Sequence, residues 1–213
     1  MALTRKAQIE LLCKKVALDY DGWEYTAKAF KNKELNHTTK IINFLWSGSS
    51  ISVSSEPIVA INNKKIDKIW KMLGRGGHYW SQSLNIREPQ YPDSHTRCFR
   101  ARIKDIIEDD AEGYIRQVLD IGIQMLDEYW DFSSEENLLL NLPVDRRPEL
   151  LECHKGICYC IARLLIGDFE YIERYYNDDI STKRPKHKDD LEKIMAHIPE
   201  YKDLYEKKGI LYI

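Results

Sequence analysis

The stretch AEGYIRQVLDIGIQMLDEYW, residues 111–130, separates two kinds of sequence in this chain of 213 residues. Apolar side chains recur in it at helical spacing, which predicts one long amphipathic helix with a buried inner side. Segments before this helix alternate apolar and polar residues as strands do, whereas segments after it keep the helical period. The predicted inner side consists of Ile115, Val118, Leu119 and Leu126, with Tyr129 or Trp130 at its end.

The N-terminal part is predicted to hold a mostly antiparallel sheet of four to five strands, because the connections are too short for parallel crossovers. Thr4 is placed to cap a first helix that ends near Asp19. Asn63 is placed to cap a short helix that stops at Gly74, and Pro57 is expected at a sheet edge or a bulge. The expected strands are residues 23–30, 38–46, 51–62, 79–86 and 96–103.

The C-terminal part is predicted to be helical. Ser133 and Glu136 have the spacing of a capping box, which predicts that a short helix begins there. Pro148 suits the first turn of the next helix, whose apolar stretch 157–166 is expected in the core. Two further amphipathic helices are expected at residues 169–176 and 188–198.

These patterns define an α+β fold in which a sheet-rich half is packed against, or joined to, a helical half. We expect a basic, sheet-rich subdomain at residues 1–104 and a helical subdomain with an acidic first helix at residues 105–213, together one cooperative unit. Hydrophobic residues make up 43% of the chain and charged residues 31%, which is typical of a globular protein. The first helix carries charges among its apolar positions and is therefore not expected to be a signal peptide.

No apolar stretch approaches the roughly 20 residues that a membrane span requires. The five cysteines are an odd number without framework spacing, which favours reduced thiols. Both observations predict a soluble, cytoplasmic protein that has no membrane partner.

Charge is distributed unevenly along the chain. Residues 1–104 carry 18 lysines and arginines against 9 acidic residues, whereas residues 105–136 carry 11 acidic residues against Arg116 alone. Residues 137–213 are nearly balanced, with 13 basic and 14 acidic residues, and the whole chain has a net charge of −2. An asymmetry of this kind says little about the fold, but it argues for a partner of opposite charge.

The acidic residues follow one face of the predicted long helix. Asp120, Gln124, Asp127 and Asp131 are spaced by four, three and four residues, and no lysine lies four residues after any of these aspartates. Two interpretations stay open: the basic half of the chain neutralises this face internally, or the face binds a basic partner. Trp130 is expected either to anchor that interface or to be buried in the core. The candidate partner-binding residues are Asp120, Gln124, Asp127, Glu128, Trp130, Asp131 and Glu135.

Other patterns point away from metal or cofactor chemistry. Four ligands on one short helix cannot surround a zinc ion, so Cys153, His154, Cys158 and Cys160 are interpreted as helix residues with buried thiols. The glycines of LGRGGHYW, residues 73–80, follow a helix and precede a strand, the reverse of a phosphate-binding loop. No metal, cofactor or catalytic residue is therefore predicted, and an enzyme with a dispersed active site stays an alternative.

A basic strand face is the other alternative. Arg100, Arg102 and Lys104 alternate with apolar residues, so one face of a strand there would be basic. Such a face could bind RNA, but the aromatic motifs of RNA-binding sheets are missing, and nucleic acid is not the partner that we expect.

Three segments give the chain a likeness to a known group of proteins: GWEYTAKAFKN at 22–32, VAINNKKIDKIWK at 59–71 and YWDFSSEENLLLNLP at 129–143. With these segments the chain resembles the immunity proteins of bacterial polymorphic-toxin systems, which include contact-dependent and type VI secretion systems. The resemblance implies a small α+β protein that neutralises a cognate toxin by tight binding, usually at the active site of the toxin. Together with the acidic helix, it implies a toxin with a basic or nucleotide-binding cleft.

Overall fold

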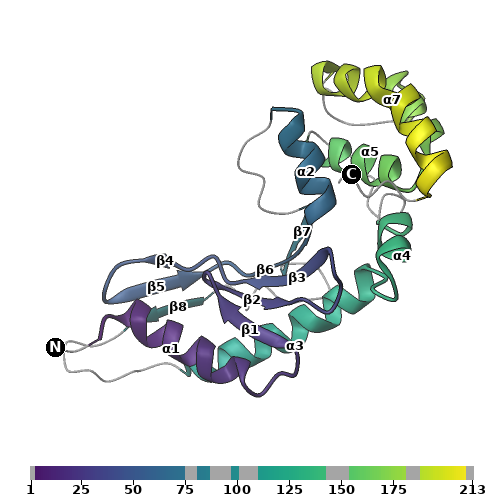
Figure 1. Cartoon of the computed structure of the whole chain (residues 1–213). Helices are drawn as coiled ribbons and strands as arrows, with labels where there is room; N and C mark the ends of the chain where they lie inside the picture. Colours follow the sequence, from purple (N-terminus) through teal and green to yellow (C-terminus); the bar gives the residue numbers. More distant parts are fainter. Residues whose placement is uncertain are drawn as a thin grey trace. The chain divides into compact units, whose positions relative to one another are not determined.

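The computed structural model describes residues 3–74, 81–86, 97–100, 110–142, 154–180 and 188–209. The chain has the predicted α+β architecture, with a five-stranded sheet from its N-terminal half and a mostly helical C-terminal half (Figure 1). It divides into two compact units that interleave along the sequence. The predicted boundary between residues 104 and 105 stays a prediction, because residues 101–109 lie outside the described ranges. The first unit is Met1–Glu34, Thr39–Ile61 and Ser83–Glu128, and the second is Leu35–Thr38, Asn62–Gln82 and Tyr129–Ile213.

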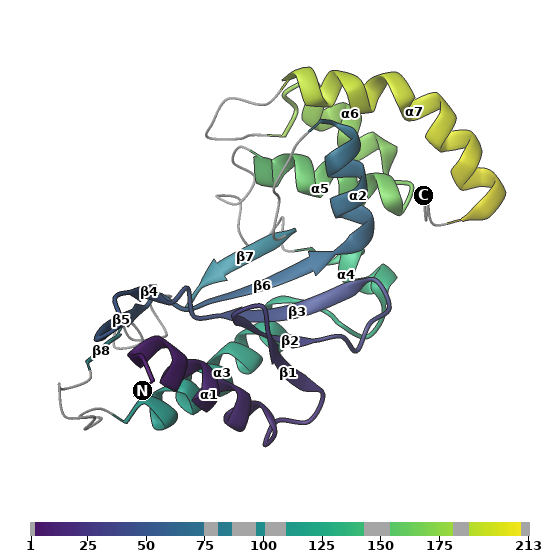
Figure 2. The same cartoon turned by 60° about the vertical axis from the view of Figure 1, so that its left-hand side comes forward.

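The main sheet has the strand order β1-β2-β3-β6-β7 (Figure 2). Its first two pairs are antiparallel in register. Glu56 donates a main-chain hydrogen bond to Phe44 at one end of the β3–β6 pair and Lys64 donates one to His37 at the other, so these strands are antiparallel. The arrows of β6 and β7 also point in opposite directions in Figure 2. The strands are β1 (Trp23–Thr26), β2 (Ala29–Asn32), β3 (Thr38–Asn43), β6 (Ile58–Asn63) and β7 (Gln82–Asn85).

The expected strand at residues 23–30 is instead a hairpin. Ala27 and Lys28 have positive φ values of 49° and 65°, and Thr26 pairs with Ala29 across this two-residue turn. Both φ values lie in the left-handed region, as in the turns that connect tight hairpins. The prediction of one strand was wrong because neither residue is the glycine or asparagine that usually marks such a turn.

A second sheet of three strands has the order β4-β5-β8, with β4 (Ser47–Gly48), β5 (Ser52–Ser55) and β8 (Arg97–Arg100). The segments expected as strands at 51–62 and 96–103 therefore contribute to two different sheets. Pro57 lies between β5 and β6, one residue before a central strand of the main sheet, so its expected place at a sheet edge is corrected, and the alternative of a bulge stays a prediction.

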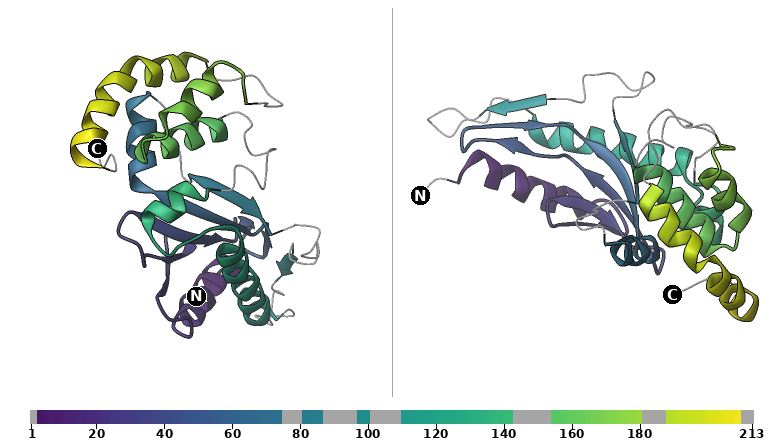
Figure 3. Two further views of the ribbon diagram at one scale, coloured as in Figure 1. Left: turned by 90° about the vertical axis from the view of Figure 1, so that its right-hand side faces the viewer. Right: turned by 90° about the horizontal axis from the view of Figure 1, so that it is seen from above.

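Two helices lie side by side on one face of the main sheet, as the left view of Figure 3 shows: α1 (Arg5–Ala17) and α3 (Ala111–Tyr129). Thr4 caps α1 as predicted, because its hydroxyl accepts a hydrogen bond from the amide of Ala7. Gly122 allows α3 to approach the sheet closely, since a Cβ atom there would lie 2.8 Å from Cδ1 of Ile42. Aromatic rings pack between α3 and the sheet. Phe44 and Tyr114 form an edge-to-face contact with 6.0 Å between their ring centres.

The second unit is mostly helical. Asn63 caps α2 as predicted, accepting hydrogen bonds from the amides of Lys65 and Ile66. α5 is the expected core helix, because its residues from Ile157 to Leu165 are buried except for Arg163. No helix in the described part of the chain is both long and apolar enough to cross a membrane. The helices are α2 (Lys64–Met72), α4 (Glu135–Leu140), α5 (His154–Leu165), α6 (Phe169–Tyr176) and α7 (Lys188–Lys208).

Candidate functional site

The outward face of α3 carries four of the seven predicted site residues. The opposite side of this helix is buried in the first unit, where Ile115, Val118 and Leu119 are inaccessible to solvent. Burial of that side orients the helix, because its polar positions must then point to water. The residues on the outward face are Asp120, Gln124, Asp127 and Glu128, all of them exposed.

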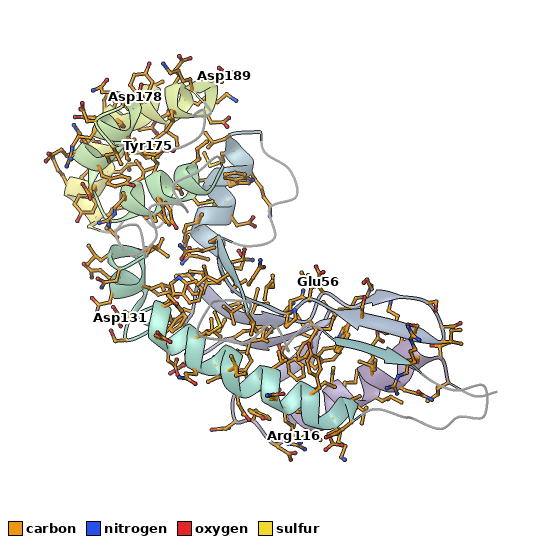
Figure 4. The ribbon with its side chains drawn as sticks, turned by 180° about the vertical axis from the view of Figure 1, so that it is seen from behind. Glu56, Arg116, Asp131, Tyr175, Asp178 and Asp189 are labelled. Atoms are coloured by element: carbon orange, nitrogen blue, oxygen red, sulfur yellow. The ribbon has the colours of Figure 1, made fainter. Side chains whose placement is uncertain are left out.

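The N-terminal half of α3 is neutralised within the first unit. Lys15 of α1 pairs with Glu112 at 2.8 Å, and Arg116 bridges Glu112 at 3.0 Å and Asp19 at 2.6 Å. Hydrogen bonds from Lys15 and Arg116 hold the pKa of Glu112 below its usual value. Figure 4 labels Arg116 on this helix. Internal neutralisation, one of the two interpretations of the acidic face, therefore applies to this half of the helix.

In the C-terminal half of α3, Asp120 and Asp127 keep most of their charge. The Tyr20 hydroxyl donates to Asp120 at 2.8 Å; burial and this carboxylate together raise the pKa of Tyr20 to about 12. A phenol at neutral pH is an uncharged donor, so the negative charge of Asp120 is not cancelled. Asp127 is 65% exposed and its nearest recorded cation, the ammonium of Lys40, lies 4.0 Å away and is closer to Glu34, at 3.1 Å. One lysine is thus shared by two carboxylates.

Trp130 belongs to the core and not to a surface, which decides between its two predicted places. Its side chain is 3% exposed, and its indole N–H donates to the carbonyl oxygen of Gln82. The amide of Gln82 in turn donates to the hydroxyl of Tyr159 in α5. This chain of hydrogen bonds satisfies the polar atoms that Trp130 and Gln82 bury. Of the two places predicted for Trp130, the core is therefore confirmed and the interface anchor was wrong.

Glu135 is held inside the second unit. Its carboxylate accepts hydrogen bonds from the main-chain amides of His37 and Thr38, at 2.6 and 3.1 Å. It also accepts one from the Thr38 hydroxyl at 2.7 Å and one from the side chain of Asn63 at 3.2 Å. A partner could reach this carboxylate only by replacing these bonds, so the predicted contact role of Glu135 is corrected to a structural one.

Asp131 is exposed in the turn between α3 and α4 (Figure 4). It accepts hydrogen bonds from the amide and the hydroxyl of Ser133, which lower its pKa. The cap of α4 is Ser134, whose hydroxyl accepts from the amide of Asn137 at 3.0 Å. The expected capping box of Ser133 and Glu136 was therefore placed one residue too early. Asp131 has a local structural role and remains open to solvent.

A depression of about 500 Å³ lies on the first unit where β1 begins and β2 ends, and the sequence patterns did not reveal it. It is continuous with the acidic face of α3: Lys40 joins Glu34 to Asp127, and Tyr20, next to Asp21, bonds Asp120. We call Asp21, Glu34, Asp120, Gln124, Asp127 and Glu128 the acidic surface. The depression is lined by Asp21, Gly22, Asn32, Lys33 and Glu34.

The cysteine pattern and the basic strand pattern define no further site in the part of the chain that the structure describes. Among the residues that the structure describes, no group of three or more side chains could hold a metal ion. Cys158 and Cys160 are buried, as expected, while Cys153 lies outside the described residues. Arg100 is exposed at the end of β8, but Arg102 and Lys104, the other residues of the proposed basic strand face, are not described.

The chain matches no protein-family model, no curated protein and no solved structure. The candidate site is therefore defined by its own chemistry: an acidic surface formed by the outward face of α3 and the rim of the neighbouring depression.

Proposed function

We propose that the chain is an immunity protein that neutralises a cognate antibacterial toxin in the cytoplasm by binding it tightly and occluding its active site. The observation that carries the proposal is the outward face of α3, where Asp120, Asp127 and Glu128 are all exposed. The partner is a toxin with a basic or nucleotide-binding cleft, because a cleft that holds phosphates has the charge that complements this face. The protein then inhibits by contact and needs no chemistry of its own.

The cost of the acidic face supports this interpretation. Asp127 and Glu128 lie in the last turn of α3, at the negative end of the helix dipole, where carboxylates are disfavoured and lysine or arginine is favoured. α3 has no basic residue after Arg116. Its charges would serve association, because an exposed negative surface accelerates the encounter with a positive one.

The rigidity of the helix supports it as well. Met125 and Leu126 are fully buried on the side opposite Asp120 and Asp127, so the helix cannot turn its carboxylates away from solvent. A preformed face binds without ordering a flexible segment, which conserves affinity.

Protection of living cells tests the proposal. The toxin domain encoded directly beside the gene for this chain is expressed in a bacterial host, alone and together with the chain, and colonies are counted. We expect the chain to restore growth and the double variant Asp120→Lys/Asp127→Lys to restore it less. The matched control is Glu192→Lys/Glu206→Lys, which makes the same change of charge at exposed positions of α7. Equal killing with and without the chain would reject the proposal.

A further inference from the structure

The depression on the first unit is opened by a glycine. Gly22 has a φ of 73°, and a Cβ atom at this position would lie 2.8 Å from Nδ2 of Asn32. The register of the hairpin pairs Trp23 with Asn32, which brings the start of β1 beside the end of β2. A side chain at position 22 would therefore fill the space in front of the Asn32 amide.

Asn32 supplies a donor with a fixed direction. The residue as a whole is 9% exposed, and its Oδ1 accepts a hydrogen bond from the amide of Glu34 at 3.0 Å. Only the oxygen of a carboxamide can accept, so this bond fixes which end is Nδ2. In the described part of the chain Nδ2 takes part in no hydrogen bond, although Asn32 lines the depression. An amide nitrogen that faces the depression without a protein partner can donate to an acceptor on a bound group.

The rim of the depression adds negative charge. Asp21 is exposed and forms no ion pair with any described residue. Glu34 is 64% exposed and shares Lys40 with Asp127, while the ammonium of Lys33 is paired with Glu24. A ligand that suits this depression therefore places a hydrogen-bond acceptor at Nδ2 of Asn32 and a cation at the carboxylates of the rim.

We propose that this depression receives an arginine residue of the protein partner. The main-chain carbonyl of that residue accepts from Nδ2 of Asn32, and its guanidinium lies between the carboxylates of Asp21 and Glu34. Arginine suits the rim better than lysine, because its planar group donates to two carboxylates in a fixed geometry. This inference rests on the proposed function, to which it adds one anchoring contact next to the acidic face of α3.

The experiment is an NMR titration of the full chain with N-acetyl-arginine methylamide, which carries both the carbonyl and the cation. We expect saturable shifts at the amides of Gly22 and Asn32 and weaker binding of the citrulline analogue, which has the same shape but no charge. Asp21→Asn is expected to weaken the arginine compound by about fivefold, as befits one exposed charge pair. The control Glu192→Gln removes an exposed carboxylate of α7, which is not among the residues that line the depression, and should leave binding unchanged.

The inference would be overturned by no shifts at Gly22 and Asn32, by equal affinity for the arginine and citrulline compounds, or by equal affinity in wild type and Asp21→Asn. Butylguanidine, which lacks the carbonyl, should bind more weakly; equal binding would also overturn it, because Nδ2 of Asn32 would then have no function. None of these results bears on the protection of cells from the toxin, so failure of the pocket and failure of the proposed function are distinguishable.

Discussion

Glu135 joins three segments of the second unit through a single carboxylate. Its two oxygens accept hydrogen bonds from residues at the start of β3 and from Asn63 at the end of β6, while the residue itself begins α4. Carboxylate acceptors bonded by several donors are among the stronger polar interactions in a protein. The residue therefore acts in the stability of the second unit.

Glu135→Gln replaces one acceptor oxygen by a donor that faces other donors. We expect the free energy of unfolding to fall by about 1–3 kcal/mol, since donors of this cluster lose their partner. Urea denaturation followed by circular dichroism measures it. Glu136→Gln, at an exposed neighbouring position, is the control and should change the midpoint little. Equal midpoints for the two variants would contradict the structural role of Glu135.

Tyr20 allows the environment of Asp120 to be measured directly. Its pKa is raised to about 12, first by burial and then by its hydrogen bond to Asp120. A pKa raised in the folded state means that the neutral phenol stabilises the fold. This contribution is complete below the ordinary pKa of 10.0 and is lost as the pH rises through about 12.

Asp120→Asn removes the carboxylate and should lower the pKa of Tyr20 toward the ordinary value. NMR of tyrosine labelled at Cζ follows the titration, and Tyr20→Phe assigns the signal. A Tyr20 signal that titrates near pH 10 in the wild type, or one that does not move in Asp120→Asn, would contradict the contact.

At the scale of elements, the contact of α3 with the sheet depends on a small residue at position 122. A Cβ there would approach Cδ1 of Ile42 to 2.8 Å and Cγ1 to 3.1 Å, and Ile42 is fully buried. Gly122→Ala gains about 1 kcal/mol of helix propensity but forces the core apart at a cost of about 1–3 kcal/mol. We expect a net loss of stability in thermal unfolding.

Ile42→Val removes the nearest atom and is the matched background for this substitution. The penalty of Gly122→Ala should be smaller there, with a coupling energy of about 1 kcal/mol in the double-mutant cycle. Strict additivity of the two substitutions would show that α3 does not press on Ile42.

The turn between β1 and β2 contains a strain that glycine would remove. Lys28 has a φ of 65°, a conformation that costs an L-residue with a side chain about 1–2 kcal/mol. Lys28→Gly should therefore raise the midpoint of thermal unfolding, whereas Lys28→Ala keeps the Cβ and should change it little. A lower midpoint for Lys28→Gly than for Lys28→Ala would contradict the assigned turn.

Helix ends could be predicted from the sequence because their signals are local. The caps at Thr4 and Asn63 were predicted and are confirmed, since each is read from a few neighbouring residues. Strand pairing could not be predicted from the sequence in the same way. β5 pairs with β8 some 45 positions further along, and nothing in either segment specifies this partner.

For the whole molecule, segregation of charge indicated an acidic surface but not its extent. Periodicity predicted which residues of α3 face outward, and the structure confirms the exposure of Asp120, Gln124, Asp127 and Glu128. Glu135 could not be separated from them, because its partners lie 72 to 98 positions away in the sequence. The depression was missed because it combines the turn before β1 with the end of β2, a pairing that depends on the hairpin.

The most direct test of the account is the rate at which the chain associates with the purified toxin domain, measured by stopped-flow fluorescence at low and high salt. Asp120→Lys/Asp127→Lys should slow association at low salt by about tenfold or more, and the difference should shrink at high salt as charges are screened. Glu192→Lys/Glu206→Lys, with the same net charge, should retain the wild-type rate. Equal rates for both double variants at every salt concentration would contradict a role of the α3 face in binding.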